Sequence, residues 1–401
     1  PPVTDGVVII EQGFIQSVEE RGRLPQGATV IHAEGKTVMP GLIDAELHLH
    51  GIKSGDPLGR MLDPPTLRTL RASADARNLL EAGFTSVRDL NSTTALALKR
   101  GVEEGIIKGP KIIVAEPVFH TASPTDTPFV PKEWLKDDWE SGTWSGPLVD
   151  GVENCVKAVR RGKRKGADLI KIMTTGGSMR ADDVPDIPIG SMEEIEAIVS
   201  EAHRLRMKVA AHAVAGEGLL NAIRGGVDTI EHAFYAGDEA IGLMAKRNTI
   251  LVPTLSVVYV QATDGKHYAP HIVKNATRHY ESAARAFKKA LNAGVRIASG
   301  SDFGGYPPVT HGSKNTIELE LMVKAGMSPM QAIVAATKTA AEALGVEETT
   351  GTIEVNKEGD VIVVDGDPLS NICLLQDGSN VSMVLKRGEI VVNRGLKVSS
   401  H

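Results

Sequence analysis

Apolar and polar positions in the middle of the chain follow two alternating patterns. Short apolar runs, typical of buried strands, are separated by longer stretches with the spacing of amphipathic helices. The eight runs cover residues 42–47, 85–90, 111–115, 169–173, 209–213, 229–233, 250–255 and 295–299. Eight buried strands that alternate with helices predict an α/β fold, a (β/α)8 TIM barrel over residues 39–345.

The two ends of the chain have a different pattern, in which short strands are separated by turns. These strands are expected at residues 6–10, 14–18 and 29–32, and again at 352–353, 360–365 and 383–385. Because the same pattern of short strands and turns returns at the other end of the chain, we predict one small β-sandwich domain built from residues 1–38 and 346–401.

Composition narrows the class of protein. The 401 residues are 42% hydrophobic, which suits a globular chain with a large core, and the net charge of −6 gives no electrostatic footprint for nucleic acid. No run approaches the 18 apolar residues of a membrane helix. Two cysteines, Cys155 and Cys373, are too few for a disulfide framework, so we expect a cytoplasmic protein. A strand or a cleaved leader before Pro1 remains an open alternative.

Several potential metal ligands come at the ends of the predicted barrel strands. Catalytic groups of such barrels sit where the strands end, at the C-terminal face. The candidates, in chain order, are His48, His50, Lys171, His212, His232 and Asp302. Imidazole and carboxylate groups suit Zn²⁺, Mn²⁺ or Fe²⁺, and a catalytic site leaves one position open for water.

Lys171 lies inside an apolar strand, where loss of solvation disfavours its ammonium form. A neutral amine can react with carbon dioxide to give a carbamate, and this carboxylate can bridge two metal ions. The alternative is a lysine that reaches out of the barrel to solvent.

Taken as a set, the motifs around these ligands resemble the amidohydrolase superfamily and, within it, the prolidase and imidazolonepropionase-like branch. The segments that carry the resemblance are Gly41-Leu42-Ile43-Asp44, Thr174-Thr175-Gly176-Gly177 after Lys171, Ala211-His212-Ala213, Ile230-Glu231-His232-Ala233, Ser299-Gly300-Ser301-Asp302, and His311 with Asn315 and Glu318. The resemblance implies a metal-dependent hydrolase with a site for two divalent ions, Zn²⁺ being the expected metal. One ion would be held by the first-strand histidines and Asp302, the other by His212 and His232, with carbamylated Lys171 between them. Asp302 would be the catalytic proton shuttle.

The first strand departs from this family pattern, which places its histidines two and four residues after the Asp of Gly-Leu-Ile-Asp. Counted from Asp44, those positions hold Glu46 and His48. Either Glu46 replaces the missing histidine, the alternative we favour, or a bulge makes His48 and His50 the pair. A site for a single metal, held mainly by Lys171, His212 and His232, is a third alternative.

Residues that could contact a substrate are harder to identify. We predict Tyr235, Arg180, His120 and His311. Arg180 could hold a carboxylate through two parallel hydrogen bonds or be a surface charge, and His311 could line the pocket or cap a helix. Related peptidases carry Gly-Gly-His after the third strand, but Pro124 replaces that histidine here. The stretch from Trp134 to Trp144 resembles a lid.

We therefore predict a metal-dependent amidohydrolase that cleaves a peptide-like amide bond, in a dipeptide or an N-acyl amino acid with a free carboxylate. The first alternative is a cyclic-amide hydrolase or deaminase of the same superfamily. The second is a non-enzymatic descendant that binds a small molecule. The expected partners are a small-molecule substrate and further copies of the chain in a homo-oligomer, with no nucleic acid and no membrane.

Overall fold

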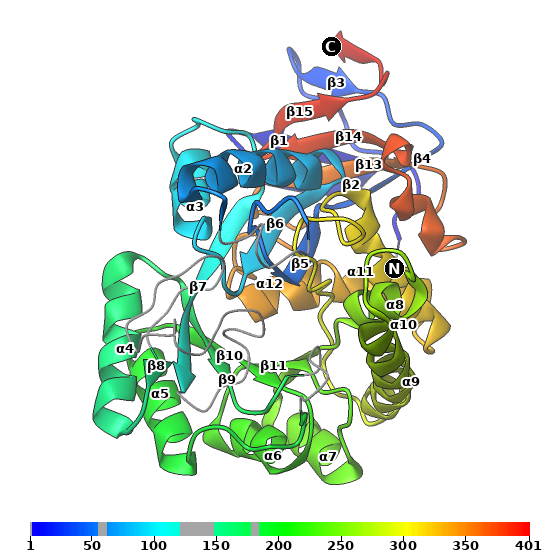
Figure 1. Cartoon of the computed structure of the whole chain (residues 1–401). Coiled ribbons are helices and arrows are strands. Elements are labelled where there is room, and N and C mark those ends of the chain that lie inside the picture. Colours follow the sequence, from blue (N-terminus) through cyan, green and yellow to red (C-terminus); the bar gives the residue numbers. More distant parts are fainter. Residues whose placement is uncertain (1, 55–61, 121–147, 178–183) are drawn as a thin grey trace.

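A parallel barrel surrounded by helices and a set of antiparallel sheets make up this chain (Figure 1). The structure is a computed structural model that describes residues 2–54, 62–120, 148–177 and 184–401. It confirms the predicted fold class. Arg180, Pro124 and the stretch 134–144 lie outside the described residues.

Neighbouring parallel strands form most of the barrel wall. In spatial order they are β12 (Ile250–Val252), β11 (Thr229–His232), β10 (Lys208–Ala213), β9 (Leu169–Met173), β7 (Lys111–His120), β6 (Phe84–Asp89) and β5 (Leu42–Leu47), with β8 (Leu148–Val149) paired to β7. Except for β8, which the sequence did not predict, these strands start within two residues of the predicted starts, because strands buried on both faces leave continuous apolar runs in the sequence.

The eighth predicted strand, residues 295–299, is not a regular strand. Ile297 makes an isolated parallel bridge to Leu251 of β12, and Ala298 N–H donates to the Leu251 carbonyl at 2.9 Å. On the other side, Ala45 N–H of β5 donates to the Ser299 carbonyl at 2.8 Å. This segment therefore joins β12 to β5 and nearly closes the barrel, with too few ladder bonds to count as a strand.

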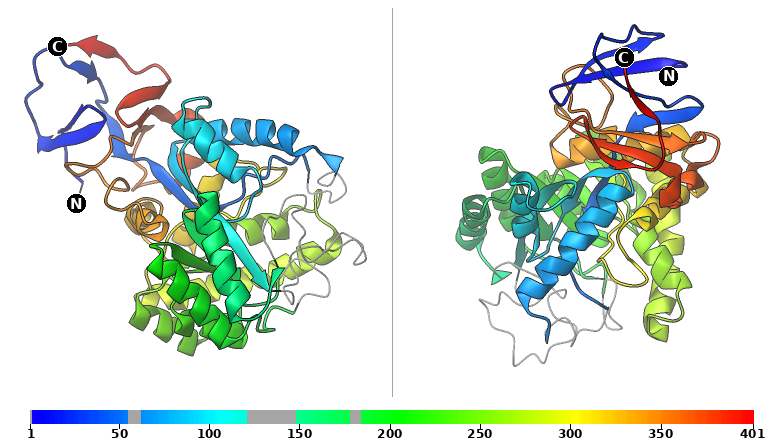
Figure 2. Two further views of the ribbon diagram at one scale, coloured as in Figure 1. Left: turned by 90° about the vertical axis from the view of Figure 1, so that its left-hand side faces the viewer. Right: turned by 90° about the horizontal axis from the view of Figure 1, so that it is seen from above.

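Helices pack around the outside of the barrel (Figures 1 and 2). They are α2 (Pro65–Glu81), α3 (Ala95–Glu103), α4 (Val152–Lys165), α5 (Met192–Arg204), α6 (Gly216–Gly225), α7 (Asp238–Arg247), α8 (Leu255–Thr263), α9 (Pro270–Asn292), α10 (Ile317–Lys324) and α11 (Pro329–Ala335), with the short 3₁₀ turns η2 (Ser313–Thr316), η3 (Ile372–Gln376) and η4 (Gly378–Asn380). Within the described ranges, no helix is long and apolar enough to cross a membrane.

One end of the barrel is filled by the small side chains of α12 (Lys338–Leu344). Ala340 and Leu344 of this helix share a buried cluster with interior residues near the strand starts, among them Ile43 and Leu169. The helix thereby covers the N-terminal ends of the strands. The opposite end remains for the polar groups.

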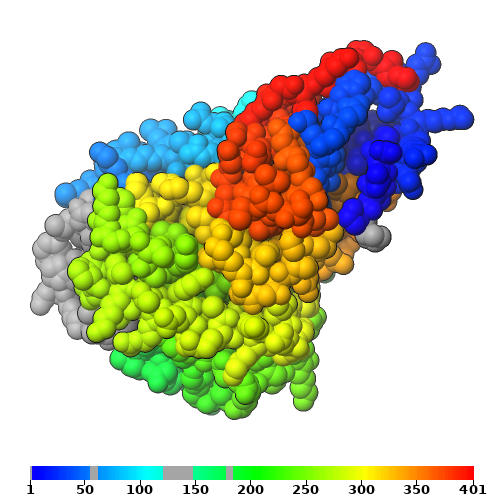
Figure 3. All heavy atoms as spheres, turned by 90° about the vertical axis from the view of Figure 1, so that its right-hand side faces the viewer, coloured from blue at the N-terminus to red at the C-terminus, as the bar shows by residue number. Residues whose placement is uncertain are grey.

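The terminal sheets form a small sandwich against the barrel, where the first and last segments lie together (Figure 3). Its strands are β1 (Gly6–Glu11), β2 (Phe14–Glu20), β3 (Thr29–Ile31), β4 (Lys36–Pro40), β13 (Val361–Asp365), β14 (Val381–Lys386), β15 (Glu389–Asn393) and β16 (Val398–Ser400). They pair as a four-stranded antiparallel sheet, β15-β14-β13-β4, and as two-stranded sheets β1-β2 and β16-β3.

The alternating side chains of β13 explain the position of this sheet. Val361 and Val363 pack toward Ile10 of β1, while Ile362 and Val364 belong to the main barrel core. Successive residues of a strand point to opposite faces, so β13 contributes side chains both to the barrel core and to the core of the terminal sheets. The predicted strand at 352–353 is absent, and the proposed domain boundary between residues 38 and 39 falls inside β4, so that division stays a prediction.

Candidate active site

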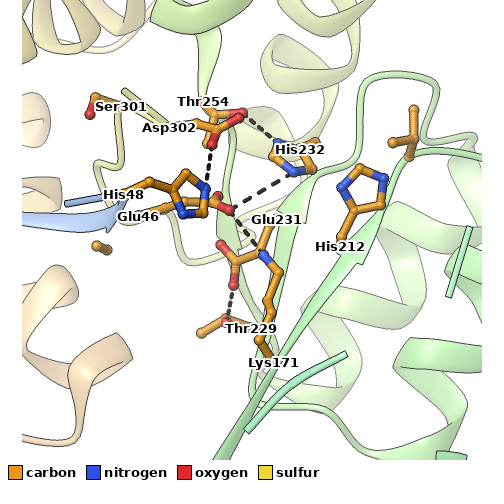
Figure 4. Close-up of polar contacts among 12 residues, drawn as sticks. Glu46, His48, Lys171, His212, Thr229, Glu231, His232, Thr254, Ser301 and Asp302 are labelled. Atoms are coloured by element: carbon orange, nitrogen blue, oxygen red, sulfur yellow. Dashed lines mark hydrogen bonds and ion pairs between the residues drawn. The ribbon is translucent and has the colours of Figure 1, made fainter. Parts of the chain in front are cut away.

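Polar side chains from five parts of the barrel converge at the C-terminal ends of its strands (Figure 4). They come from β5, β9, β10, β11 and the loop after the eighth segment. The residues are Glu46, His48, Lys171, His212, His232 and Asp302. Side chains that lie more than a hundred residues apart in the sequence are therefore neighbours in the fold.

Glu46 lies at the centre of this group. Lys171 Nζ donates to Glu46 Oε1 at 2.9 Å, and the two side chains are 7% and 1% exposed. His232 Nε2 is 3.9 Å from the same oxygen. Burial raises the pKa of Glu46, against the lowering effect of Lys171. Its second oxygen, Oε2, is buried and has no hydrogen-bond partner among the described residues. This oxygen can therefore coordinate a bound cation.

His48 and His50 are neighbours but face different partners. His48 Nε2 donates to Asp302 Oδ1 at 3.0 Å, and ligand atoms of Glu46, His48 and Asp302 lie within 4.8 Å of one another. The His50 ring stacks on His48 at 4.9 Å between centroids, and its Nδ1 shares a 3.2 Å hydrogen bond with Ser92 Oγ. This arrangement favours Glu46 over His50 as a ligand. The assignment stays a prediction.

The other two histidines are oriented by hydrogen bonds on the side of the ring away from the site. His212 Nε2 donates to the Gly176 carbonyl at 3.2 Å, and His232 Nδ1 bonds Thr254 Oγ1 at 2.7 Å. Such contacts fix the tautomer and leave the other ring nitrogen as a potential ligand. Burial lowers the pKa of His232 to about 4 and that of His212 well below its usual value. Both rings are therefore neutral near pH 7, the form that binds metals.

Left-handed backbone conformations gather at the site. His232, Thr254 and Asp302 have φ values of 78°, 48° and 54°. Residues with side chains rarely adopt such values, and they persist where surrounding contacts hold them. One such contact is the 2.7 Å hydrogen bond from Asp302 N–H to the Glu46 carbonyl. The backbone is thus constrained where the polar groups meet.

Asp44 ties the first strand to the loop that carries Asp302. Its buried carboxylate accepts hydrogen bonds from Glu46 N at 3.1 Å, Ser301 N at 3.0 Å and Asn315 Nδ2 at 2.9 Å. Burial raises the pKa of Asp44 to about 6. Asn315, which belongs to the motifs that carry the resemblance, supports the frame of the site through its contacts with Asp44 and Ser301.

A buried ion pair below the site was not identified from the sequence. Arg88 of β6 donates to Glu231 Oε1 at 3.0 Å and to Thr229 Oγ1 at 3.1 Å, and the Arg88 and Glu231 side chains are fully buried. Burial raises the pKa of Glu231 to about 7 despite the adjacent guanidinium. The available signal was a charged residue inside each of two apolar strands.

The predicted substrate contacts have varied surroundings. His311 Nε2 donates to the His48 carbonyl at 3.0 Å, which supports the strand end. Tyr235 Oη shares a 2.9 Å hydrogen bond with His279 Nδ1 of α9. The buried His120 lies against two residues of α4 and α5: its Nε2 is 3.6 Å from Glu194 Oε2 and 3.9 Å from Cys155 Sγ. Their roles in substrate binding stay predictions.

The ligand types fit a divalent cation. Neutral imidazoles and the unpaired oxygen of Glu46 offer lone pairs in one small volume. Burial acts to raise the pKa of Asp302, but the hydrogen bond from His48 and the neighbouring His232, His48 and Lys171 side chains hold the pKa below its usual value, so this carboxylate is ionised. The donor set of nitrogen and carboxylate oxygen is that of catalytic metal sites.

Comparison with known proteins agrees with this geometry. Residues 37–391 match the model of the amidohydrolase family. Ochratoxinase from Aspergillus niger is 30% identical over 98% of this chain and 84% of its own length. Imidazolonepropionase from Treponema denticola is 26% identical over 97% of this chain and 92% of its own. The crystal structure of a prolidase complexed with N-methylphosphonate-L-proline has a TM-score of 0.85, with 32% identity over 96% of this chain and 94% of the other.

Proposed function

The chain belongs to the amidohydrolase family and is a hydrolase, and we propose that it cleaves the amide bond of a dipeptide or an N-acyl amino acid with a free carboxylate. The observation that carries this proposal is the convergence of Glu46, His48 and Asp302 with the neutral His212 and His232. Such a group suits hydrolysis assisted by a metal ion.

Glu46, His48, His212, His232 and Asp302 would hold one or two divalent ions, with Zn²⁺ as the expected metal. When bound, such an ion supplies activation of water and polarisation of the scissile carbonyl. The chain's own residues must orient the substrate and move protons. The carbamate that the sequence predicts on Lys171 stays a prediction.

Asp302 is the group proposed to move the proton. Its ionised carboxylate accepts a proton from the attacking water and then delivers it to the nitrogen of the leaving amine. Two backbone hydrogen bonds fix the loop that carries Asp302. The Asp302 N–H donates to the Glu46 carbonyl, and the preceding Ser301 N–H donates to the Asp44 carboxylate. A fixed carboxylate can serve both transfers without moving far.

The substrate class rests on the relatives and on polar groups near the site. The prolidase crystallised with N-methylphosphonate-L-proline and a structure of a Xaa-Pro dipeptidase with bound methionine are both similar to this chain. A Tyr235–His279 pair next to β11 and the predicted Arg180 are the proposed contacts for the substrate carboxylate. The similarity to ochratoxinase, an amide hydrolase, keeps N-acyl amino acids beside dipeptides in the proposal.

A substrate panel tests the proposal. The protein is loaded with Zn²⁺ and given dipeptides, N-aromatic-acyl amino acids and cyclic amides, and the products are separated by mass spectrometry. Release of a free amino acid, abolished by chelation and restored by Zn²⁺, is the expected result. Asp302→Asn is the variant at the site, and Asp377→Asn, at the exposed residue that caps η4, is its matched control. The exposed variant should retain full activity.

A second candidate is a cyclic-amide hydrolase, because imidazolonepropionase is also similar to this chain. Ring opening or ammonia release in the same panel would support it and contradict our proposal. Binding of a small molecule with no turnover of any amide would identify a non-enzymatic descendant. The proposal also includes a homo-oligomer in the cytoplasm, and light scattering of the purified protein tests the first of these.

A further inference from the structure

The carboxylate of Glu46 occupies the position between the two halves of the site, and this bears on the state of Lys171. We infer that Glu46 takes the place of the lysine carbamate, and that Lys171 remains an unmodified amine paired with Glu46. This inference rests on the proposed function only in assuming that the site holds a divalent ion. It concerns the residues that this chain offers to the ion.

The contacts of Glu46 are those expected of a central carboxylate. Its Oε1 lies 2.9 Å from Lys171 Nζ and 3.9 Å from His232 Nε2, on the side of the second pair of histidines. The same residue has a ligand atom within 4.8 Å of those of His48 and Asp302, on the side of the first strand. The Glu46 carboxylate therefore connects both groups, as a bridging carbamate would.

Space around Lys171 argues against modification of its amine. Carbamylation forms a bond between Nζ and the carbon of carbon dioxide and releases one proton from the nitrogen, so Nζ gains three heavy atoms. At 2.9 Å, Glu46 Oε1 is in direct hydrogen-bond contact with Nζ. Both side chains are almost fully buried, at 7% and 1% exposed, so a carbamate on Nζ would need the place that the Glu46 carboxylate fills.

The count of carboxylates leads to the same conclusion. With histidines at both first-strand positions, a carbamate and Asp302 would be the two anionic ligands. In this chain Glu46 and Asp302 already supply two carboxylates, and Glu231 lies fully buried directly below. A carbamate would add a third carboxylate at the position between the two halves that Glu46 already fills. The amine of Lys171 instead gives Glu46 a favourable partner.

The difference between a carboxylate and an imidazole explains why one substitution changes both positions. A glutamate at residue 46 extends from the end of β5 far enough to contact Lys171 on β9, across the barrel interior. A histidine there would end in a ring whose nitrogens are ligands of only one ion. Glu46 thus replaces the missing imidazole and also makes the carbamate unnecessary.

Carbon-13 NMR tests this inference directly. The Zn²⁺-loaded protein is equilibrated with ¹³C-labelled bicarbonate, and a carbamyl-lysine resonance is sought in the wild type, in Lys171→Met and in Glu46→His. We expect no such resonance in the wild type and its gain in Glu46→His. A second measurement follows Zn²⁺ uptake by the metal-free protein, which should be independent of bicarbonate in the wild type and accelerated by bicarbonate in Glu46→His.

Two results would overturn the inference. A carbamyl resonance in the wild type that disappears in Lys171→Met would show that the lysine is modified beside Glu46. Absence of the resonance from both the wild type and a folded, Zn²⁺-binding Glu46→His would show that Glu46 is not what excludes it. Neither result depends on turnover, because the substrate panel measures hydrolysis separately. A modified lysine in an enzyme that releases amino acids would contradict the inference and leave the proposed function standing.

Discussion

Replacement of Arg88 by methionine tests whether the buried ion pair holds the barrel interior together. Arg88→Met keeps a long unbranched side chain but removes the guanidinium. That group donates to Glu231 Oε1, Thr229 Oγ1 and the carbonyls of Ala45 and Ala343. These partners belong to β5, β11 and α12, so the variant removes polar contacts among three elements at once.

The expected loss of stability can be bounded from the structure. Breaking a buried ion pair by removing one partner costs about 3–5 kcal/mol, because the other charge is left buried. Burial already raises the pKa of Glu231 to about 7, so without Arg88 this carboxyl can take up a proton near neutral pH and relieve part of the penalty. We therefore expect about 3 kcal/mol, the lower end of that range.

Urea unfolding followed by far-UV circular dichroism measures this loss. A double variant, Arg88→Met with Glu231→Met, should recover more than half of it, since apolar residues can replace a buried pair at little cost. Arg160→Met is the matched control, because its partner Glu201 forms a pair in which Arg160 is 59% exposed, and it should cost less than about 1 kcal/mol. A loss for Arg88→Met no larger than that of the control would refute the reasoning, as would additive losses in the double variant.

Three further predictions concern the site and its frame. Asp302→Asn should lower kcat by about 10²–10⁴-fold with the fold intact, as judged by circular dichroism, because it removes the proposed proton shuttle; wild-type rates would contradict that role. Thr254→Val removes the partner of His232 Nδ1 and should weaken Zn²⁺ binding by about 10–100-fold in chelator competition, while the control Thr263→Val, at the far end of the helix that Thr254 precedes, should not. Burial raises the pKa of Glu318 to about 8 from 4.5, so the folded state holds a proton that the unfolded state loses, and this group destabilises the fold as pH rises from about 4.5 to 8. Glu318→Gln should flatten that decline in urea-unfolding free energy, and an unchanged slope would show that the carboxyl is ionised when folded.

The barrel was predictable from the sequence because its strands are buried on both faces. The runs 42–47 and 169–173 coincide with β5 and β9, since a parallel strand covered by helices outside and side chains inside requires apolar residues throughout. The segment 295–299 has the same composition but is not a regular strand. Its pairing depends on how β12 and β5 approach each other, which no local pattern records.

Candidate ligands could be found from the sequence, but their partners could not. Residues two apart in a strand point to the same side, so the sequence cannot separate Glu46, His48 and His50, and only the fold shows that His50 faces Ser92. Arg88 and Glu231 are 143 residues apart, so the pairing of these two charges depends on barrel closure. The Lys171–Glu46 contact is the clearest case, because each residue alone suggested a different role.

Anomalous X-ray diffraction at the zinc absorption edge, from crystals of the Zn²⁺-loaded protein, tests the central claim most directly. It locates bound metal without any assumption about substrate. Our account predicts one or two peaks whose protein ligands include Glu46 and His48, with His212, His232 and Asp302 completing the set and His50 bound to no peak. A peak bound by His50 in place of Glu46, or no peak among these residues, would contradict it.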